Sequence, residues 1–118
     1  MYLEEEIVEW VLRLIREGRD VPLCPKCGVA VRSYLSGWGI YDNIKGGELV
    51  DFEPRDDVPE CCEECNSDVY WACDLEDIVD FLSEIAKDVP LARKILKRFY
   101  EEGILEDENI KRMVAILI

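Results

Sequence analysis

The residues of this chain that are best suited to chemistry are cysteines, and four of the six form two short pairs. The pairs are Cys24-Pro25-Lys26-Cys27-Gly28 and Cys62-Glu63-Glu64-Cys65-Asn66, each a Cys-x-x-Cys followed by a residue that tolerates a positive φ angle. A tight turn of this kind points backbone N–H groups at sulfur while both thiolates face one ion. Four thiolates are the soft tetrahedral ligand set that suits zinc. The spacing therefore predicts one zinc ion, bound by Cys24, Cys27, Cys62 and Cys65.

The two pairs resemble the knuckles of a zinc ribbon, and the resemblance covers residues 23–73. In zinc ribbons each knuckle lies at the mouth of a hairpin, and both pairs here precede a segment with strand character. The resemblance implies a small antiparallel β unit. Its metal is expected to be structural, because four cysteines fill the coordination of zinc and leave no position for water or substrate. The long stretch between Cys27 and Cys62 implies an elaborated insert between the two turns.

Other uses of the cysteines remain open. Iron can take the same four ligands, as in a rubredoxin-like electron carrier, although the second pair lacks the proline and glycine usual in those knuckles. Three disulfides are a further alternative, which an absent export signal disfavours. Cys61 could replace Cys62, but Cys62 repeats the two-residue spacing of the first pair. Cys73, at the end of a predicted strand, is expected to be a small buried hydrophobe.

Catalysis finds little support in the sequence. The chain contains no His, the usual general base and activator of nucleophiles. No serine lies in a nucleophile motif, no Gly-rich loop suits phosphate, and the many carboxylates single out no functional pair. We therefore expect no enzyme and no small-molecule substrate.

The charge of the chain bears on its partners. The formal net charge is −13, and a zinc ion with four thiolates would add about −2 locally. Duplex binding depends on the release of cations from phosphates, so this charge argues against general adhesion to DNA, RNA or anionic lipid. It permits a protein partner, including a basic one, and the predicted function is that of an interaction or regulatory protein.

One segment reverses this charge and supports an alternative function. Arg93, Lys94, Lys97 and Arg98 cluster on a helix predicted to begin at Pro90. The helix could contact phosphate as part of a transcription-associated factor, which zinc ribbons often accompany. The simpler interpretation is a solvated face, because Glu101 and Glu102 follow Lys97 and Arg98 at the spacing of intrahelical ion pairs.

The predicted fold is α+β, a zinc ribbon packed with an N-terminal helix and a C-terminal three-helix segment, in one compact unit. Its parts are residues 1–20, 21–73 and 74–118. Strands are expected within the middle part, with a hairpin turn at Gly46-Gly47; the segments are Val29 to Ser36, Gly39 to Ile44, Glu48 to Phe52 and Asp68 to Ala72. Aromatic side chains of this region are expected to fill a small β core rather than form a platform for bases or peptides; these are Tyr34, Trp38, Tyr41, Tyr70 and Trp71.

Apolar residues at helical spacing predict the buried face of each helix. In the helix 2–18 these are Leu3, Ile7, Trp10, Val11, Leu14 and Ile15. The second helix is expected to begin after Asp74, which forms a cap-like opening with Asp77 three residues on. Its buried face is predicted to consist of Leu75, Ile78, Val79, Leu82, Ile85 and Ala86. In the helix from Pro90 to Gly103 they are Leu91, Ile95, Phe99 and Tyr100. The last helix, from about Glu106, ends in an apolar run, 113–118, that either packs inside or contacts another chain.

Two further expectations concern the setting of the protein. No apolar run approaches the length of a membrane span and no basic leader precedes one, so a cytoplasmic protein without a membrane partner is expected. Abundant charged residues without Gln or Thr are typical of proteins from hot environments, which suggests a thermophilic source.

Overall fold

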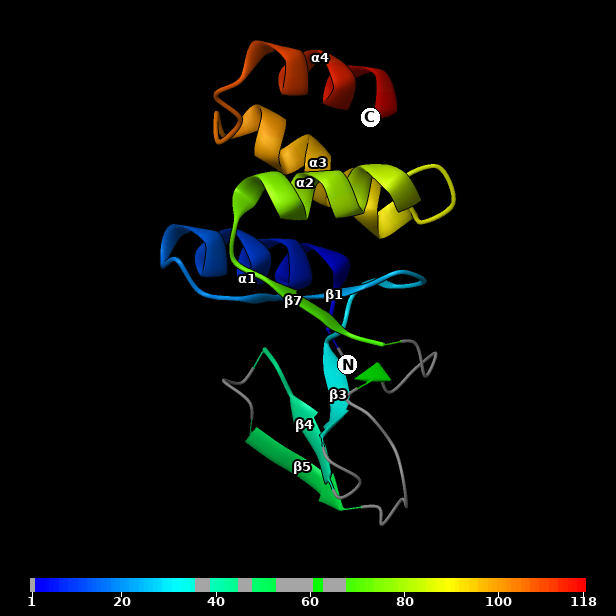
Figure 1. The fold of residues 1–118 in the computed structure, drawn as a ribbon. Coiled ribbons are helices and arrows are strands. Elements are labelled where there is room, and N and C mark those ends of the chain that lie inside the picture. The colour runs from blue at the N-terminus through cyan, green and yellow to red at the C-terminus, as the bar shows by residue number, and fades with distance from the viewer. Residues whose placement is uncertain (1, 36–38, 45–47, 53–60, 63–67) are drawn as a thin grey trace.

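The computed structural model describes part of the chain, and for some strand residues it describes the backbone alone. The described residues are 2–35, 39–44, 48–52, 61–62 and 68–118. The backbone alone is described for 33–35, 39–41, 48–52 and 61–62. Within this part the fold is α+β: four helices lie together at one end, and a small antiparallel sheet lies beneath them (Figure 1).

Helix α1 (Glu4–Arg16) confirms the predicted N-terminal helix. Its first turn is acidic and its last turn carries Arg13 and Arg16, an order that complements the helix dipole. Gly18, at φ +69°, follows the helix end. The prediction for Leu3 is wrong: it is the N-cap and is 71% exposed, because it precedes the first turn and lies outside the buried stripe. Val8 and Leu12 are buried as well, since α1 contacts both a strand and a helix.

The sheet beneath the helices has the order β2-β1-β7, formed by Gly28–Val29, Val21–Cys24 and Tyr70–Ala72. Both pairings are antiparallel, with Cys24 opposite Gly28 and Leu23 opposite Tyr70. All of β1 is buried, because helices cover it and strands flank it on both sides. The sheet thus fixes Cys24 at the end of a central, fully packed strand.

A second antiparallel sheet, with the order β5-β4-β3-β6, lies farther from the helices (Figure 1). Its strands are Glu48–Phe52, Gly39–Asp42, Arg32–Leu35 and Cys61–Cys62. The prediction of Glu48–Phe52 is confirmed at both ends. The predicted strand from Val29 to Ser36 is instead divided between β2 and β3, since the chain leaves the first sheet at Ala30 and Val31. The expected Gly46-Gly47 turn lies outside the described residues, although β4 and β5 pair as its hairpin would.

Three helices follow β7, as predicted: α2 (Leu75–Ile85), α3 (Pro90–Glu101) and α4 (Glu108–Leu117). The Asp74 side chain accepts from the Glu76 N–H and so caps α2. Pro90 is in the first turn of α3, where its missing N–H is not needed. Asp107 caps α4 by accepting from two N–H groups, so this helix begins slightly later than predicted.

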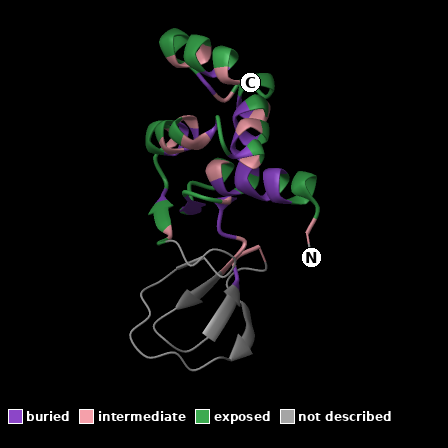
Figure 2. Ribbon diagram, turned by 90° about the vertical axis from the view of Figure 1, so that its right-hand side faces the viewer, coloured by how far each residue is buried: buried purple, intermediate pink, exposed green. Residues whose placement is uncertain are grey.

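One hydrophobic core joins the helices to the first sheet (Figure 2). Trp10, Leu23, Ile78 and Phe99 are among its buried side chains. Tyr100, which the sequence pattern placed on the same face as Phe99, is 45% exposed, so that prediction is wrong. In α4 only Val114 is buried, and Ile116 is 85% exposed. Most of the apolar run 113–118 therefore faces solvent in this chain.

Hydrogen bonds tie the end of β4 to the helical end of the molecule. The Tyr2 hydroxyl donates to the buried Asp42 carboxylate at 2.7 Å. Asn43 donates through its side chain to the Ala30 carbonyl at 2.7 Å and through its backbone to the Val31 carbonyl at 2.8 Å. These bonds hold the second sheet beside the segment that follows the first cysteine pair.

Candidate metal centre

The first cysteine pair lies in the tight turn of a β-hairpin. Cys24 ends β1, Gly28 begins β2, and the two residues are opposite each other in the antiparallel register. The Cys27 N–H donates to Cys24 Sγ at 3.3 Å. Gly28 has a φ of +94°, which side-chain-bearing residues rarely adopt. This is the backbone arrangement that the Cys-x-x-Cys-Gly spacing predicts for the pair.

Small and apolar residues pack around Cys24 in this turn. Cys24 and Ala30 are fully buried, and Cys27 and Val69 pack against them. A Cβ built on Gly28 would lie 3.6 Å from the Leu91 side chain and 3.6 Å from the Ala92 backbone nitrogen. The turn therefore rests against the N-terminal end of α3, where the helix dipole is positive and stabilises nearby negative charge.

The second pair lies mostly outside the described residues. The backbone of Cys62 belongs to β6 and is opposite Ser33, while Cys65 and the side chain of Cys62 are not described. The chain direction is informative, because β6 runs antiparallel to β3 and so leads from Cys62 toward the start of β3. Val69, seven positions after Cys62 in the sequence, packs on Cys24.

The described donors suit a soft metal ion. Cys24 and Cys27 carry thiols rather than a disulfide and lie in one turn. Among the described side chains no group of three or more Cys, Asp or Glu converges as a metal site would, and the predicted third and fourth ligands are not in that set. The assignment of zinc, and of the four ligands, stays a prediction that the first turn fits.

The remaining cysteines have different outcomes. Cys73 is exposed, so the expectation of a buried hydrophobe is wrong: it follows the last residue of β7 and precedes the cap of α2, beyond the packed strand. The backbone of Cys61, in β6, is opposite Tyr34 of β3.

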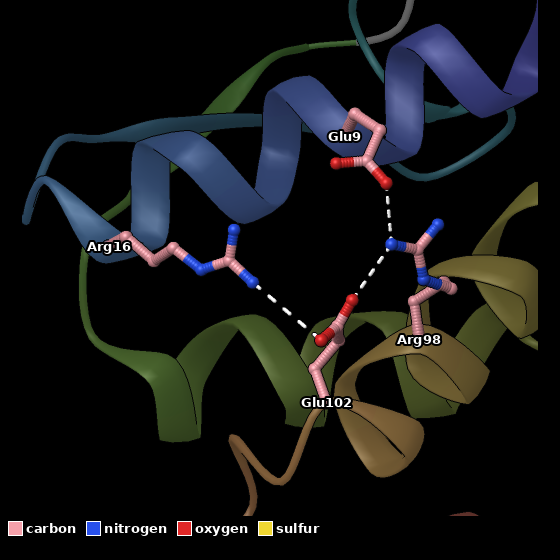
Figure 3. A network of polar contacts seen from close by, with 4 residues as sticks. All are labelled: Glu9, Arg16, Arg98 and Glu102. Carbon is pink, nitrogen blue, oxygen red and sulfur yellow. Dashed lines mark hydrogen bonds and ion pairs between the residues drawn. The ribbon is translucent and has the colours of Figure 1, made fainter.

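The basic residues of α3 mostly engage other groups. Arg93 donates to the carbonyls of Ala86 and Lys87, and Lys94 pairs with Glu4. Arg98 donates to Glu9 of α1 and to Glu102 at 2.9 Å, and Arg16 lies 3.8 Å from the other oxygen of Glu102 (Figure 3). The predicted ion pair of Arg98 with Glu102 is confirmed. Contact with nucleic acid through Arg93, Lys94, Lys97 and Arg98 stays a prediction that none of these contacts favours.

The ion-pair network shifts the pKa values of Glu102 and Arg98. The hydrogen bond from Arg98 lowers the pKa of the Glu102 carboxyl below its usual value. Hydrogen bonds to Glu102 and then Glu9 raise the pKa of Arg98. The four side chains link α1 to α3 and carry no feature of a reactive site.

The aromatic residues of the β region are only partly described. Tyr70 and Trp71 are 48% and 37% exposed, so for these two the expected role in a β core is wrong. Their strand β7 is an edge of the first sheet, which leaves large side chains open to solvent. The Tyr70 ring still packs on Phe81 of α2, with ring centroids 5.9 Å apart. Trp38 and the side chains of Tyr34 and Tyr41 lie outside the described residues.

Sequence reasoning missed the apolar neighbours of the cysteine turn. Ala30 and Val69 lie six and forty-five residues from Cys24, and only the strand pairings bring them together with it. The sequence offers one signal for this packing, namely that Cys24 follows an apolar segment and therefore lies at the end of a buried strand.

Comparison with protein-family models, with curated proteins and with solved structures found no match to this chain. A search of the described helices found none with both the length and the apolar character needed to cross a bilayer.

Proposed function

We propose that this protein is a non-enzymatic zinc-binding interaction protein. Cys24, Cys27, Cys62 and Cys65 hold one structural zinc ion, and an acidic surface binds a protein partner. The observation that carries the metal assignment is the first cysteine turn, with its sulfur-directed N–H and its glycine at positive φ. Zinc closed by four thiolates supplies shape rather than reactivity, because no coordination position remains for a substrate.

The course of the chain supports recruitment of the second pair. Cys62, whose backbone is opposite Ser33, ends β6. Val69, which packs on Cys24, lies seven positions after Cys62 in the sequence. Cys65 lies between them, four positions before Val69 in the sequence.

Charge balance supports a metal at this position. Four thiolates around one zinc ion leave about −2, which is costly to bury without compensation. The N-terminal end of α3 beside Gly28 and the Cys27 N–H donated to Cys24 both offset negative charge.

The acidic surface supports a protein partner. Between residues 68 and 86 the chain contains no Lys or Arg. The outer face of α2 carries four exposed carboxylates within this stretch; they are Glu76, Asp77, Asp80 and Glu84. A surface of this sign attracts basic partners and repels nucleic acid.

Metal analysis of the protein purified under reducing conditions tests the proposal. We expect one zinc ion per chain in the wild type and in Cys73→Ser, the matched control. Cys24→Ser, Cys62→Ser and Cys65→Ser should each lower the zinc content sharply, whereas Cys61→Ser should not. Full occupancy in Cys62→Ser combined with loss in Cys61→Ser would reassign the third ligand. One iron ion per chain, together with absorption in the visible range, would contradict the zinc assignment and support an iron electron carrier instead.

A further inference from the structure

An open groove lies where the beginning of α2 meets the beginning of α4. Its volume is about 350 Å³. Its floor is apolar and comes from three segments, the first turns of α2 and α4 and the loop that joins α3 to α4; the floor residues are Leu75, Val79, Ile104, Leu105 and Ile110. Val79 and Leu105 are buried, while Leu75, Ile104 and Ile110 remain partly exposed.

The rim of the groove is acidic. Glu76, Glu106 and Asp107 line it and are exposed, and no Lys or Arg occurs among its described lining residues. Glu76 and Asp107 also complement the N-terminal ends of α2 and α4. Glu106 has no such role, since it precedes the cap of α4. The groove therefore carries more negative charge than the two helix ends require.

The form of the groove favours a protein side chain over a small molecule. Pockets for small ligands are about 300–1,000 Å³ and surround most of the ligand with a few convergent polar groups. This groove is near the lower limit of that range, and its polar groups are exposed carboxylates at the rim. Such a site suits one or two bulky apolar side chains presented by a segment that remains outside the groove.

We propose that this groove, formed by the starts of α2 and α4, binds a short basic segment of a partner protein. One or two apolar side chains of the segment enter the floor, and its Lys or Arg residues pair with Glu76, Glu106 and Asp107. The inference rests on the proposed function, because it names the chemistry of the protein partner and one place where it binds. Charge complementarity selects this occupant: a second copy of the chain would bring a net charge of −13 to an acidic rim.

Selection from a library of random 12-residue peptides, displayed on phage and applied to the immobilised zinc-loaded full chain, tests the proposal. We expect enrichment of peptides that combine a bulky apolar residue with at least two Lys or Arg. Binding of a synthetic enriched peptide, measured by fluorescence anisotropy, should weaken about tenfold or more in Glu106→Lys. Glu5→Lys is the matched control, since it reverses an exposed charge on α1, which contributes no residue to the groove. Ile104→Ala tests the floor and should also weaken binding.

The outcomes separate the groove from the wider function. Equal weakening in Glu106→Lys and Glu5→Lys would overturn the proposal and indicate general charge attraction. Peptides that bind Glu106→Lys and Ile104→Ala like the wild type would overturn the groove but keep a protein-binding function. No enrichment of basic peptides, or enrichment of sequences that lack cations, would overturn the inference while leaving the zinc assignment to metal analysis. Self-association that Ile104→Ala abolishes would assign the groove to a second copy instead.

Discussion

Gly28 links backbone conformation to the proposed metal chemistry. Its φ of +94° allows the chain to turn directly after Cys27 and begin β2 opposite Cys24. A Cβ at this position would meet its neighbours at 3.6 Å, an ordinary contact distance, so space is available for a methyl group. The constraint on this residue is therefore conformational rather than steric.

Gly28→Ala should destabilise the protein and also weaken metal binding. A side chain held at positive φ costs about 1–3 kcal/mol, and relief of that strain would move the cysteine turn. Gly18→Ala is a matched control, because Gly18 has a φ of +69° with nothing within 4 Å of a built Cβ. It should lower the free energy of unfolding in urea while leaving zinc affinity, measured by competition with a chelator, unchanged. Equal zinc affinity in both variants would contradict the role given to Gly28.

Glu102 should contribute stability that depends on pH. Its pKa is lowered in the folded protein by the hydrogen bond from Arg98. A carboxyl of this kind stabilises the fold above its unfolded pKa, about 4.3, and loses that contribution as the pH falls through its folded pKa. The difference in unfolding free energy between wild type and Glu102→Gln should thus be present at pH 7 and disappear in stronger acid. High salt should reduce it at pH 7, since the pair is at the surface.

Urea unfolding at several pH values measures this difference, with Glu101→Gln as the matched control on the same helix. Comparison between variants at each pH removes the effect of acid on the thiolates, which all of them share. A difference for Glu102→Gln that persists unchanged into strong acid would refute the assignment.

At the scale of elements, helix α3 shows what its sequence pattern could and could not predict. The start at Pro90 and the end near Gly103 follow from local chemistry, and both are confirmed. The exposure of Tyr100 depends on which neighbours cover the helix, and the pattern could not supply that information. Ala92 and Leu96 complete the buried face that Ile95 and Phe99 begin.

Substitutions at two adjacent positions of α3 should therefore differ strongly in effect. Phe99 is fully buried, so Phe99→Ala should cost about 3–5 kcal/mol through lost burial and a residual cavity. Tyr100→Ala should cost less than about 1 kcal/mol, as is usual for surface changes. Thermal or urea unfolding of the zinc-loaded variants measures both costs. Similar costs at the two positions would show that Tyr100 is covered in solution, by a second chain or by another part of this one.

Strand assignments show a similar division. β5 follows from its short run of mostly apolar residues and from the glycines that precede it. The sequence pattern did not predict the short strands β1 and β2 as separate elements. β1 is buried throughout, so its sequence is a continuous apolar segment with a proline and lacks the alternation typical of a strand. Division of the predicted strand Val29 to Ser36 into two sheets is a tertiary effect, set by the hydrogen bonds of Ala30, Val31 and Asn43.

At the scale of the whole molecule, the first cysteine turn was easier to predict than its surroundings. Cysteine spacing identified a turn that the structure contains at Cys24 to Gly28. The support of that turn by α3 depends on residues more than sixty positions away, which no local pattern encodes. The groove between α2 and α4 was missed for the same reason, since it joins three segments that are amphipathic or polar when read alone.

Removal of zinc should loosen one end of the molecule and leave the other folded. The main core joins four helices to the first sheet through apolar side chains and includes neither Cys24 nor Cys27, the two proposed ligands whose side chains the structure describes. Small zinc fingers unfold without metal because they lack such a core. In this chain, a chelator under reducing conditions should preserve most of the helical circular dichroism. The thermal midpoint should fall by on the order of 10 °C, equivalent to about 2–3 kcal/mol in a chain of this size.

Amide hydrogen exchange locates the change. Faster exchange is expected at Cys24 to Ala30 and at Val69, which surround the cysteine turn, whereas Val11, Ile78 and Leu96 in the helices should keep their protection. The Cys73→Ser protein should respond like the wild type, because Cys73 is exposed and outside the proposed ligand set. Loss of the helical circular dichroism after zinc removal would mean that the helices and their apolar core do not stay folded without the metal. Complete removal of zinc with no change in midpoint or exchange would contradict a structural metal.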